Sequence, residues 1–303
     1  MWLIFALLTT TIWGIAEFFY KKGARADEKY AHLKICVCVG AVMFFHALFT
    51  VLTQDFTYNP INLLRYLPVS LLYIISMAFS FFGMRFIEES ISDPIENTSG
   101  AICSLLCVIF LGERLSGLSI LAILIILAGI LGIGFLENSG ETDRKKKIGR
   151  KMATVAFAMP FMYALLDAVG SFLDVYYLDI SLSPLVDVSE DTIELVANTT
   201  YELTFAVCAL FLFLFMRIKG VRFEIGQQRD KIMAAVCETA GQLTYVYAMS
   251  GNGAAAAPIL SAVCIVSLLL SRIFLKEKLT VKQYLFIILV IIGILILAIA
   301  EGE

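Results

Sequence analysis

Two pairs of residues in this sequence combine an aromatic ring with a carboxylate four positions later. Trp13 precedes Glu17, and Tyr163 precedes Asp167, in segments that are otherwise largely apolar. Residues four apart lie on one face of a helix. The face of an aromatic ring attracts a cation by about 0.5–2 kcal/mol, and a neighbouring carboxylate neutralises the cation's charge. The two pairs therefore predict a binding site for an organic cation.

The same pairs also have a purely structural interpretation. Trp13 and Tyr163 could be ordinary core or lipid-interface aromatics, with Glu17 and Asp167 near the ends of their helices. A carboxylate at the centre of a membrane helix costs about 2.5–3.5 kcal/mol on insertion scales, so one that stays there usually faces a wet cavity or a partner. This cost favours the binding site.

Another segment carries a polar stripe of Glu238, Gln242 and Tyr245, at spacings of four and three. We expect the stripe to line the same cavity. An interhelical hydrogen-bond network, worth about 0.6 kcal/mol per bond, is the alternative. Glu96 is a candidate for coupling or gating, or else an acid in a first helical turn, where the helix dipole favours it. With two further aromatic residues, the predicted substrate-binding set is Trp13, Glu17, Tyr73, Phe82, Tyr163, Asp167, Glu238, Gln242 and Tyr245.

The segments that position these residues are long enough to cross a membrane. The chain has 303 residues, 60 % of them hydrophobic and 16 % charged, and its mean hydropathy is +0.87. A soluble domain usually has about 25 % charged residues. Apolar runs of about 20 residues match a hydrocarbon thickness of roughly 30 Å, and in lipid they must be helical. The expected helices cover residues 2–20, 31–52, 66–87, 91–111, 117–137, 152–177, 195–216, 231–249, 254–275 and 282–300.

Basic residues indicate how these helices are oriented. With ten helices, 21 of the 23 Lys and Arg residues fall in loops on one side, and only Arg65 and Arg114 fall on the other. Cytoplasmic loops carry the excess of Lys and Arg. We therefore expect an integral protein of a bacterial plasma membrane, with both termini outside.

An internal repeat accompanies this asymmetry. A shift of 164 residues places the fourth and fifth helices on the ninth and tenth without a gap, so that Gly129 meets Gly293. A shift of 150 places the first aromatic–carboxylate pair on the second. Five helices per half is an odd number, so the halves must insert in opposite orientations, as in many secondary transporters. We expect one five-helix repeat in residues 1–140 and a second in residues 141–303.

Short motifs link this repeat to a known family. Leu111-Gly112-Glu113-Arg114-Leu115 follows the fourth helix, and Leu275-Lys276-Glu277-Lys278-Leu279 follows the ninth. Together with Trp13-Gly14, they resemble the drug/metabolite transporter superfamily, specifically its ten-helix EamA-like branch. The resemblance implies an all-α integral membrane fold of two inverted five-helix repeats. It also implies alternating access around a central cavity, without ATP or a prosthetic group.

The sixth helix departs from the family pattern, because it contains Pro160 and the two acids Asp167 and Asp174. The resemblance therefore says least about how the sixth helix lines the cavity. Family substrates include amino acids, amines, nucleotide-related compounds and drugs, so the fold alone does not name the substrate.

These features predict a secondary active transporter for a small cationic or zwitterionic metabolite, an amine or an amino acid. Protons are the expected coupling ion, because a buried carboxylate can exchange a proton for a cation. A neutral or nucleotide-related substrate is the alternative. A membrane-embedded enzyme or a channel is less favoured, since the sequence has no HExxH, GxSxG or CxxC pattern. We expect a monomer with no metal, no cofactor and, at a net charge of −3, no nucleic-acid partner.

Overall fold

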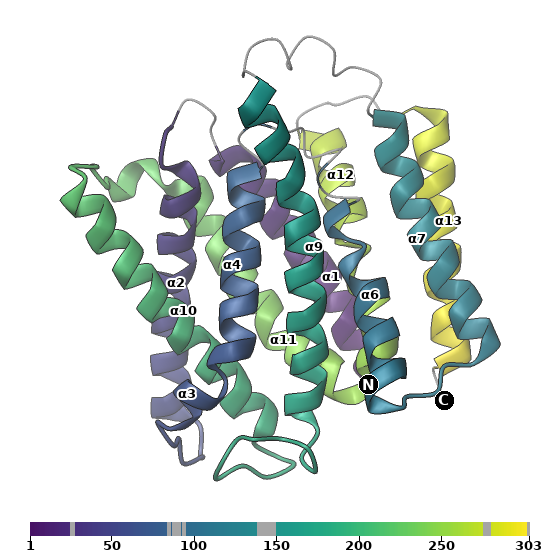
Figure 1. The fold of residues 1–303 in the computed structure, drawn as a ribbon, viewed down its shortest axis with the longest axis horizontal. Coiled ribbons are helices and arrows are strands. Elements are labelled where there is room, and N and C mark those ends of the chain that lie inside the picture. Colours follow the sequence, from purple (N-terminus) through teal and green to yellow (C-terminus); the bar gives the residue numbers. More distant parts are fainter. Residues whose placement is uncertain are drawn as a thin grey trace.

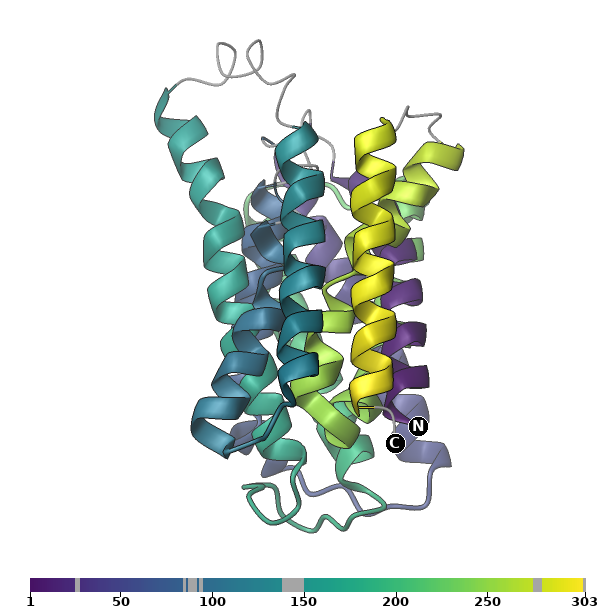
Figure 2. The same ribbon diagram turned by 90° about the vertical axis from the view of Figure 1, so that its right-hand side faces the viewer.

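A computed structural model describes residues 1–24, 28–83, 86, 92, 95–137, 150–274 and 280–301. Throughout these residues the regular secondary structure is helical, and the helices run side by side in a bundle (Figure 1). Both termini lie at the same end of the bundle in two perpendicular views (Figure 2). The motif at residues 275–279 and the repeat boundary at residue 140 lie outside the described residues.

The helices follow the segments expected from hydropathy, with ends that differ by several residues. A π-helical turn, η1, extends α6, and a short 3-10 helix, η3, precedes α11. The elements are α1 (Trp2–Gly23), α2 (Ala31–Thr53), α3 (Asn62–Arg65), α4 (Leu67–Gly83), α6 (Ser99–Leu106), η1 (Cys107–Leu111), α7 (Gly117–Glu137), α9 (Arg150–Leu178), α10 (Ile193–Ile218), η3 (Ile225–Gln227), α11 (Arg229–Leu260), α12 (Val263–Phe274) and α13 (Val281–Glu301).

The boundary between the eighth and ninth expected helices lies inside α11. Asn252 has a non-helical backbone (φ −166°, ψ 81°), and its side-chain oxygen accepts a hydrogen bond from the backbone N–H of Ala255 at 3.2 Å. Asn252 therefore caps a new helical stretch, as asparagine commonly does. A second break follows Leu260, and α12 continues at 45° to α11. The ninth helix is thus built from two pieces.

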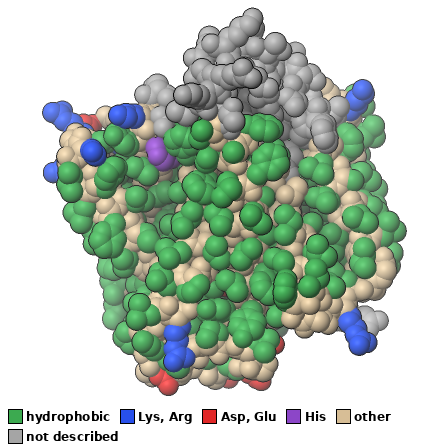
Figure 3. Space-filling view, in the orientation of Figure 1, with side chains coloured by type: hydrophobic (Ala, Val, Ile, Leu, Met, Phe, Trp, Pro, Cys, Tyr) green, Lys and Arg blue, Asp and Glu red, His purple; other side chains and the backbone are tan. Residues whose placement is uncertain are grey.

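The described surface is that of a protein embedded in lipid. In the part of the chain that the structure describes, α1, α2, α9, α10 and α13 are each long and apolar enough to span a bilayer, and the bent pair of α11 and α12 passes the same test. The helices α4, α6 with η1, and α7 are shorter and also apolar. Hydrophobic side chains cover the middle of the face in Figure 3, whereas charged side chains lie near its upper and lower margins.

Helices from the two halves of the chain pack against each other in pairs. The most extensive contacts join α1 to α11, α7 to α13, α2 to α10 and α4 to α9. In the expected repeat, the first helix (α1) corresponds to the sixth (α9), and the third helix (α4) corresponds to the eighth (α11). The contact between α1 and α11 then has its counterpart in the contact between α9 and α4. The other two pairs each join a helix to its own equivalent. The pairing supports the inverted repeat predicted from the sequence.

Two glycines show the same relation at the level of side chains. Gly129 of α7 lies directly against Val290 of α13, and Gly293 of α13 lies directly against Ile126 of α7. The shift of 164 residues found in the sequence relates Gly129 to Gly293 and Ile126 to Val290. The two contacts are therefore equivalent positions of the repeat. In both places the helices approach closely because the glycine has no side chain.

Glu28 ties α2 to α11 at the end of the bundle away from the termini. Its carboxylate contacts the ammonium group of Lys34 at 2.5 Å and that of Lys231 at 2.9 Å, and both lysines are buried. Burial opposes ionisation of Glu28, but the hydrogen bonds from the two lysines outweigh it. The pKa of Glu28 therefore lies below its ordinary value of 4.5.

This ion-pair cluster predicts a pH-dependent contribution to stability. A carboxylate whose pKa is lowered by folding stabilises the protein above its ordinary pKa, and the contribution disappears as the pH falls below 4.5 through the folded-state pKa. We expect Glu28→Gln to lower the melting temperature at neutral pH, and the difference from wild type to shrink below about pH 4. Glu190→Gln, at an exposed position, is the control. A difference that stays constant with pH would contradict the assignment.

Candidate functional site

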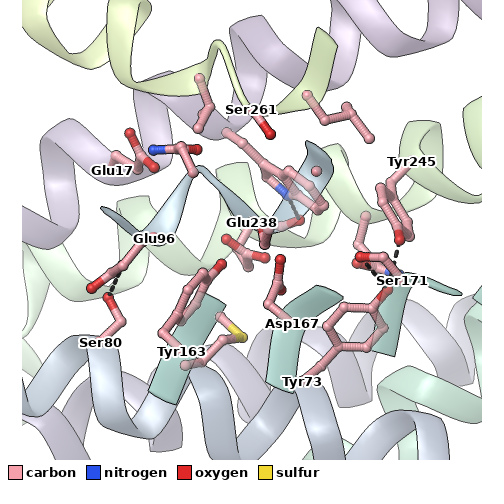
Figure 4. A pocket seen from close by; sticks show the side chains of 18 of the residues that line it. Glu17, Tyr73, Ser80, Glu96, Tyr163, Asp167, Ser171, Glu238, Tyr245 and Ser261 are labelled. Carbon is pink, nitrogen blue, oxygen red and sulfur yellow. Dashed lines mark hydrogen bonds between the residues drawn. The ribbon is translucent and has the colours of Figure 1, made fainter. Parts of the chain in front are cut away.

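A cavity of about 120 Å³ lies between α1, α4, α9 and α11 and the segment that leads into α6 (Figure 4). It brings together residues that are far apart in the sequence. Nine of the ten residues predicted for substrate binding or coupling line it: Trp13, Glu17, Tyr73, Glu96, Tyr163, Asp167, Glu238, Gln242 and Tyr245.

Phe82 is the exception, and its prediction as a cavity residue is not supported. Its ring packs against those of His32 and Phe86, with centroid distances of 5.5 and 5.2 Å. Successive residues of a helix point about 100° apart. Because Phe81 lines the cavity, its neighbour Phe82 points elsewhere.

Contacts between α1 and α11 position Glu238. The hydroxyl of Tyr20 donates a hydrogen bond to a carboxylate oxygen of Glu238 at 3.2 Å, and the indole N–H of Trp13 donates to the Glu238 carbonyl at 3.2 Å. The Trp13 ring also lies 5.1 Å from that of Tyr245. It fits there because Gly241 has no side chain: a Cβ at that position would overlap the indole.

α9 supplies the second carboxylate at the centre of the cavity. Asp167 lines the cavity together with Ser99 and Tyr163. In Figure 4 its carboxylate and that of Glu238 point toward one another. The aromatic residue and the acid of the Tyr163–Asp167 pair thus face the same space, as their spacing predicts.

Glu96 lies at the margin of the cavity, beside Ser80 (Figure 4). One of its carboxylate oxygens accepts a hydrogen bond from Ser80 at 2.7 Å, and the other accepts one from Ser92 at 2.6 Å. Because both oxygens are already engaged, Glu96 is less available to a ligand than Asp167 or Glu238.

The structure adds a polar cluster that the sequence-based site omits. Asp174 is completely buried, and it accepts hydrogen bonds from the hydroxyls of Tyr66 and Tyr73. The Tyr73 and Tyr245 hydroxyls are also 2.6 Å apart. Asp174 follows Asp167 by seven residues, so both lie on one face of α9. That spacing could have indicated that Asp174 lies near the site. It could not have identified the tyrosines that bind Asp174, because they lie outside α9.

This cluster, which we call the Asp174 layer (Tyr66, Tyr73, Asp174 and Tyr245), lies between the cavity and a second hollow nearer the termini. Val175, next to Asp174, packs against Gly253 and lines the second hollow. Asn252, at the break in α11, lines it too. The acids of this hollow are Glu113, Asp179, Glu190 and Glu194.

The charges around the central cavity are all of one sign. Among the described residues that line it, four are acids (Glu17, Glu96, Asp167 and Glu238) and none is Lys, Arg or His. The phenol of Tyr163 interacts electrostatically with all four carboxylates. Carboxylates gathered in a low-dielectric space attract positive charge strongly. The site is therefore suited to a cation.

A helical membrane bundle with an acid-lined cavity at its centre has the architecture of a carrier. The family model described as the EamA-like transporter family matches residues 1–135 and 183–299. The chain belongs to this family, as its motifs predicted. It is thus a membrane transporter of a small-molecule substrate and not an enzyme.

Two further comparisons were made. No curated protein matches the sequence significantly. Among solved structures, the crystal structure of a protein with 13 % sequence identity superposes with a TM-score of 0.68, covering 99 % of this chain and 98 % of the other. At that identity the likeness establishes the fold.

The family match does not include residues 136–182, and so it leaves out α9. The family match therefore gives no support for roles of Tyr163, Asp167 and Asp174, which rest on the geometry of α9 alone. Asp167 lines the central cavity, and Asp174 belongs to the Asp174 layer.

Proposed function

We propose that this transporter carries a small cationic or zwitterionic metabolite, an amine or an amino acid, by alternating access. One observation carries the proposal: among the described residues, four carboxylates and no basic side chain line the central cavity. Trp13 and Tyr163 add ring faces, which attract an ammonium group. The ammonium group binds between Asp167 and Glu238, whose carboxylates face each other (Figure 4).

Proton coupling follows from the same pair of acids. Two carboxylates that share a cavity repel one another when both are ionised. A proton on one of them and a cation between them are therefore alternative ways to relieve the repulsion. Binding of the ammonium group releases a proton, which is the exchange that an antiporter needs.

We also propose how the protein is arranged in its membrane. Residues 1–140 and 141–303 form two inverted repeats, a proposal supported by the reciprocal contacts of Gly129 and Gly293. Both termini face outward from a bacterial plasma membrane, because the basic loops lie on the other side. The protein acts as a monomer, since helices of one chain enclose the cavity.

A thermal-shift screen followed by transport in liposomes tests the substrate class. A bound ligand stabilises the folded protein by mass action, so amines or amino acids should raise the melting temperature of the purified protein. In liposomes the same compounds should show saturable counterflow, and a pH-sensitive dye should report proton movement in the opposite direction. Stabilisation by neutral nucleobases alone would contradict the proposal. Flux without saturation would indicate a channel.

Gly241→Ala should weaken ligand binding without a charge change. The added methyl group must displace the indole of Trp13, which removes one ring face from the cavity. A cation–π contact is worth about 0.5–2 kcal/mol, so we expect the affinity for an amine to fall about tenfold. Gly226→Ala is the matched control, because nothing lies within 4 Å of a Cβ there. Equal ligand-induced shifts in the melting temperatures of both variants would contradict this role of Trp13.

A further inference from the structure

Gln242 presents a buried hydrogen-bond donor to the central cavity. The side chain lines the cavity, and the residue is only 4 % exposed. Its amide nitrogen, Nε2, has no hydrogen-bond partner among the described residues. A buried N–H group without an acceptor is unfavourable, so a ligand atom that accepts this hydrogen bond would be favoured there.

The position of Gln242 relates this donor to the cation site. Gln242 follows Glu238 by four residues on α11, so both side chains lie on one helix face, with Cα atoms separated by about 6 Å along the axis. A small molecule with an ammonium group and an oxygen on neighbouring carbons can contact both side chains. The ligand therefore needs an acceptor oxygen close to its positive charge.

The surrounding charge limits which oxygen that is. A carboxylate could accept the hydrogen bond from Gln242, but it would lie close to the carboxylates of Asp167 and Glu238, which line the same cavity and repel a negative charge. A hydroxyl or carbonyl oxygen accepts the same hydrogen bond without bringing a negative charge. The site thus distinguishes a cation from a zwitterion.

We infer that the substrate is an organic amine with a neutral oxygen acceptor near its ammonium group, such as an amino alcohol, and that the site discriminates against α-amino acids. In the bound state the ammonium group lies between Asp167 and Glu238, and the neutral oxygen accepts the hydrogen bond from Gln242. This inference rests on the proposed function and narrows it.

Matched triplets of ligands test the inference on the full-length protein. Each triplet contains an α-amino acid, the amino alcohol in which CH₂OH replaces its carboxylate, and the amine in which CH₃ replaces it. The alanine, leucine and phenylalanine skeletons provide three sizes. In at least one triplet we expect the amino alcohol to bind about tenfold more tightly than the amine, as one hydrogen bond implies, and the amino acid to bind more weakly than both.

A variant assigns this preference to Gln242. Gln242→Met keeps the length of the side chain and removes the donor, so the ratio of amino-alcohol to amine affinity should fall to about one. Gln227→Met, at an exposed position, should keep the wild-type ratio. Because a ratio within one preparation is measured, altered yield or stability does not affect the result.

The outcomes separate this inference from the broader proposal. If an amino acid binds as tightly as its amino alcohol, the inference is wrong and transport of amines or amino acids stands. Equal binding of amino alcohol and amine by the wild-type protein also overturns it, as does an unchanged ratio in Gln242→Met. If no triplet member binds or is transported, the proposed function itself fails.

Discussion

Asp167→Asn is expected to reduce amine counterflow in liposomes about 100-fold or more. Asparagine keeps the size of the side chain and removes the charge that faces Glu238 across the cavity. Loss of one partner from a buried ion pair costs about 3–5 kcal/mol, and each 1.4 kcal/mol is about a factor of ten in affinity. Counterflow of a radiolabelled amine into proteoliposomes, measured at several concentrations, gives the change directly.

Glu238→Gln provides a second test of the same site. If both acids bind one ammonium group, their effects are not independent, and the double variant should be little worse than either single variant. Asp55→Asn, at an exposed position in the loop after α2, should transport normally and serves as the charge-removal control. Full counterflow in Asp167→Asn, with a normal melting temperature, would show that the cation does not bind there.

Much of this site could be predicted because its residues repeat at helical spacing. Trp13 and Glu17, and likewise Tyr163 and Asp167, share a helix face whatever the helix packs against. The cost of a buried carboxylate then indicates that such a face meets a cavity or a partner. These arguments need only one helix at a time, and the cavity contains all four residues.

Phe82 shows where that reasoning stops. The helix α4 carries Ser70, Tyr73, Ser76 and Ser80 at spacings of three and four. Phe82 lies about 180° from Tyr73 around the helix, a signal that the prediction did not use. Phe81 and Phe82 differ only in direction, and packing against neighbouring helices decides it. The break at Asn252, by contrast, was expected, because Ser250-Gly251-Asn252-Gly253 separates the eighth and ninth apolar runs.

Asp174 was missed as a site residue for a related reason. Its two tyrosine partners, Tyr66 and Tyr73, come from the α3–α4 junction and from α4, and Tyr245 of α11 joins the cluster through the Tyr73 hydroxyl. No spacing within one helix relates these partners to Asp174. Contacts between helices follow from how the helices are packed, which the repeat pattern suggests only in outline.

Asp174→Leu should give a large loss of stability. Leucine accepts no hydrogen bonds, so the substitution leaves the buried hydroxyls of Tyr66 and Tyr73 without this acceptor. A buried donor that loses its partner costs about 1–3 kcal/mol, and the two together should lower the melting temperature by about 5–10 °C. Asp174→Asn keeps one acceptor oxygen and should lie between Asp174→Leu and wild type.

The interpretation depends on the hydroxyls rather than on the loss of a charge. Tyr66→Phe removes one donor, so Asp174→Leu should cost less in that background than alone. Asp55→Leu, at an exposed position in the loop after α2, controls for the substitution itself. If Asp174→Leu melted like wild type, the hydroxyls of Tyr66 and Tyr73 would not depend on this carboxylate.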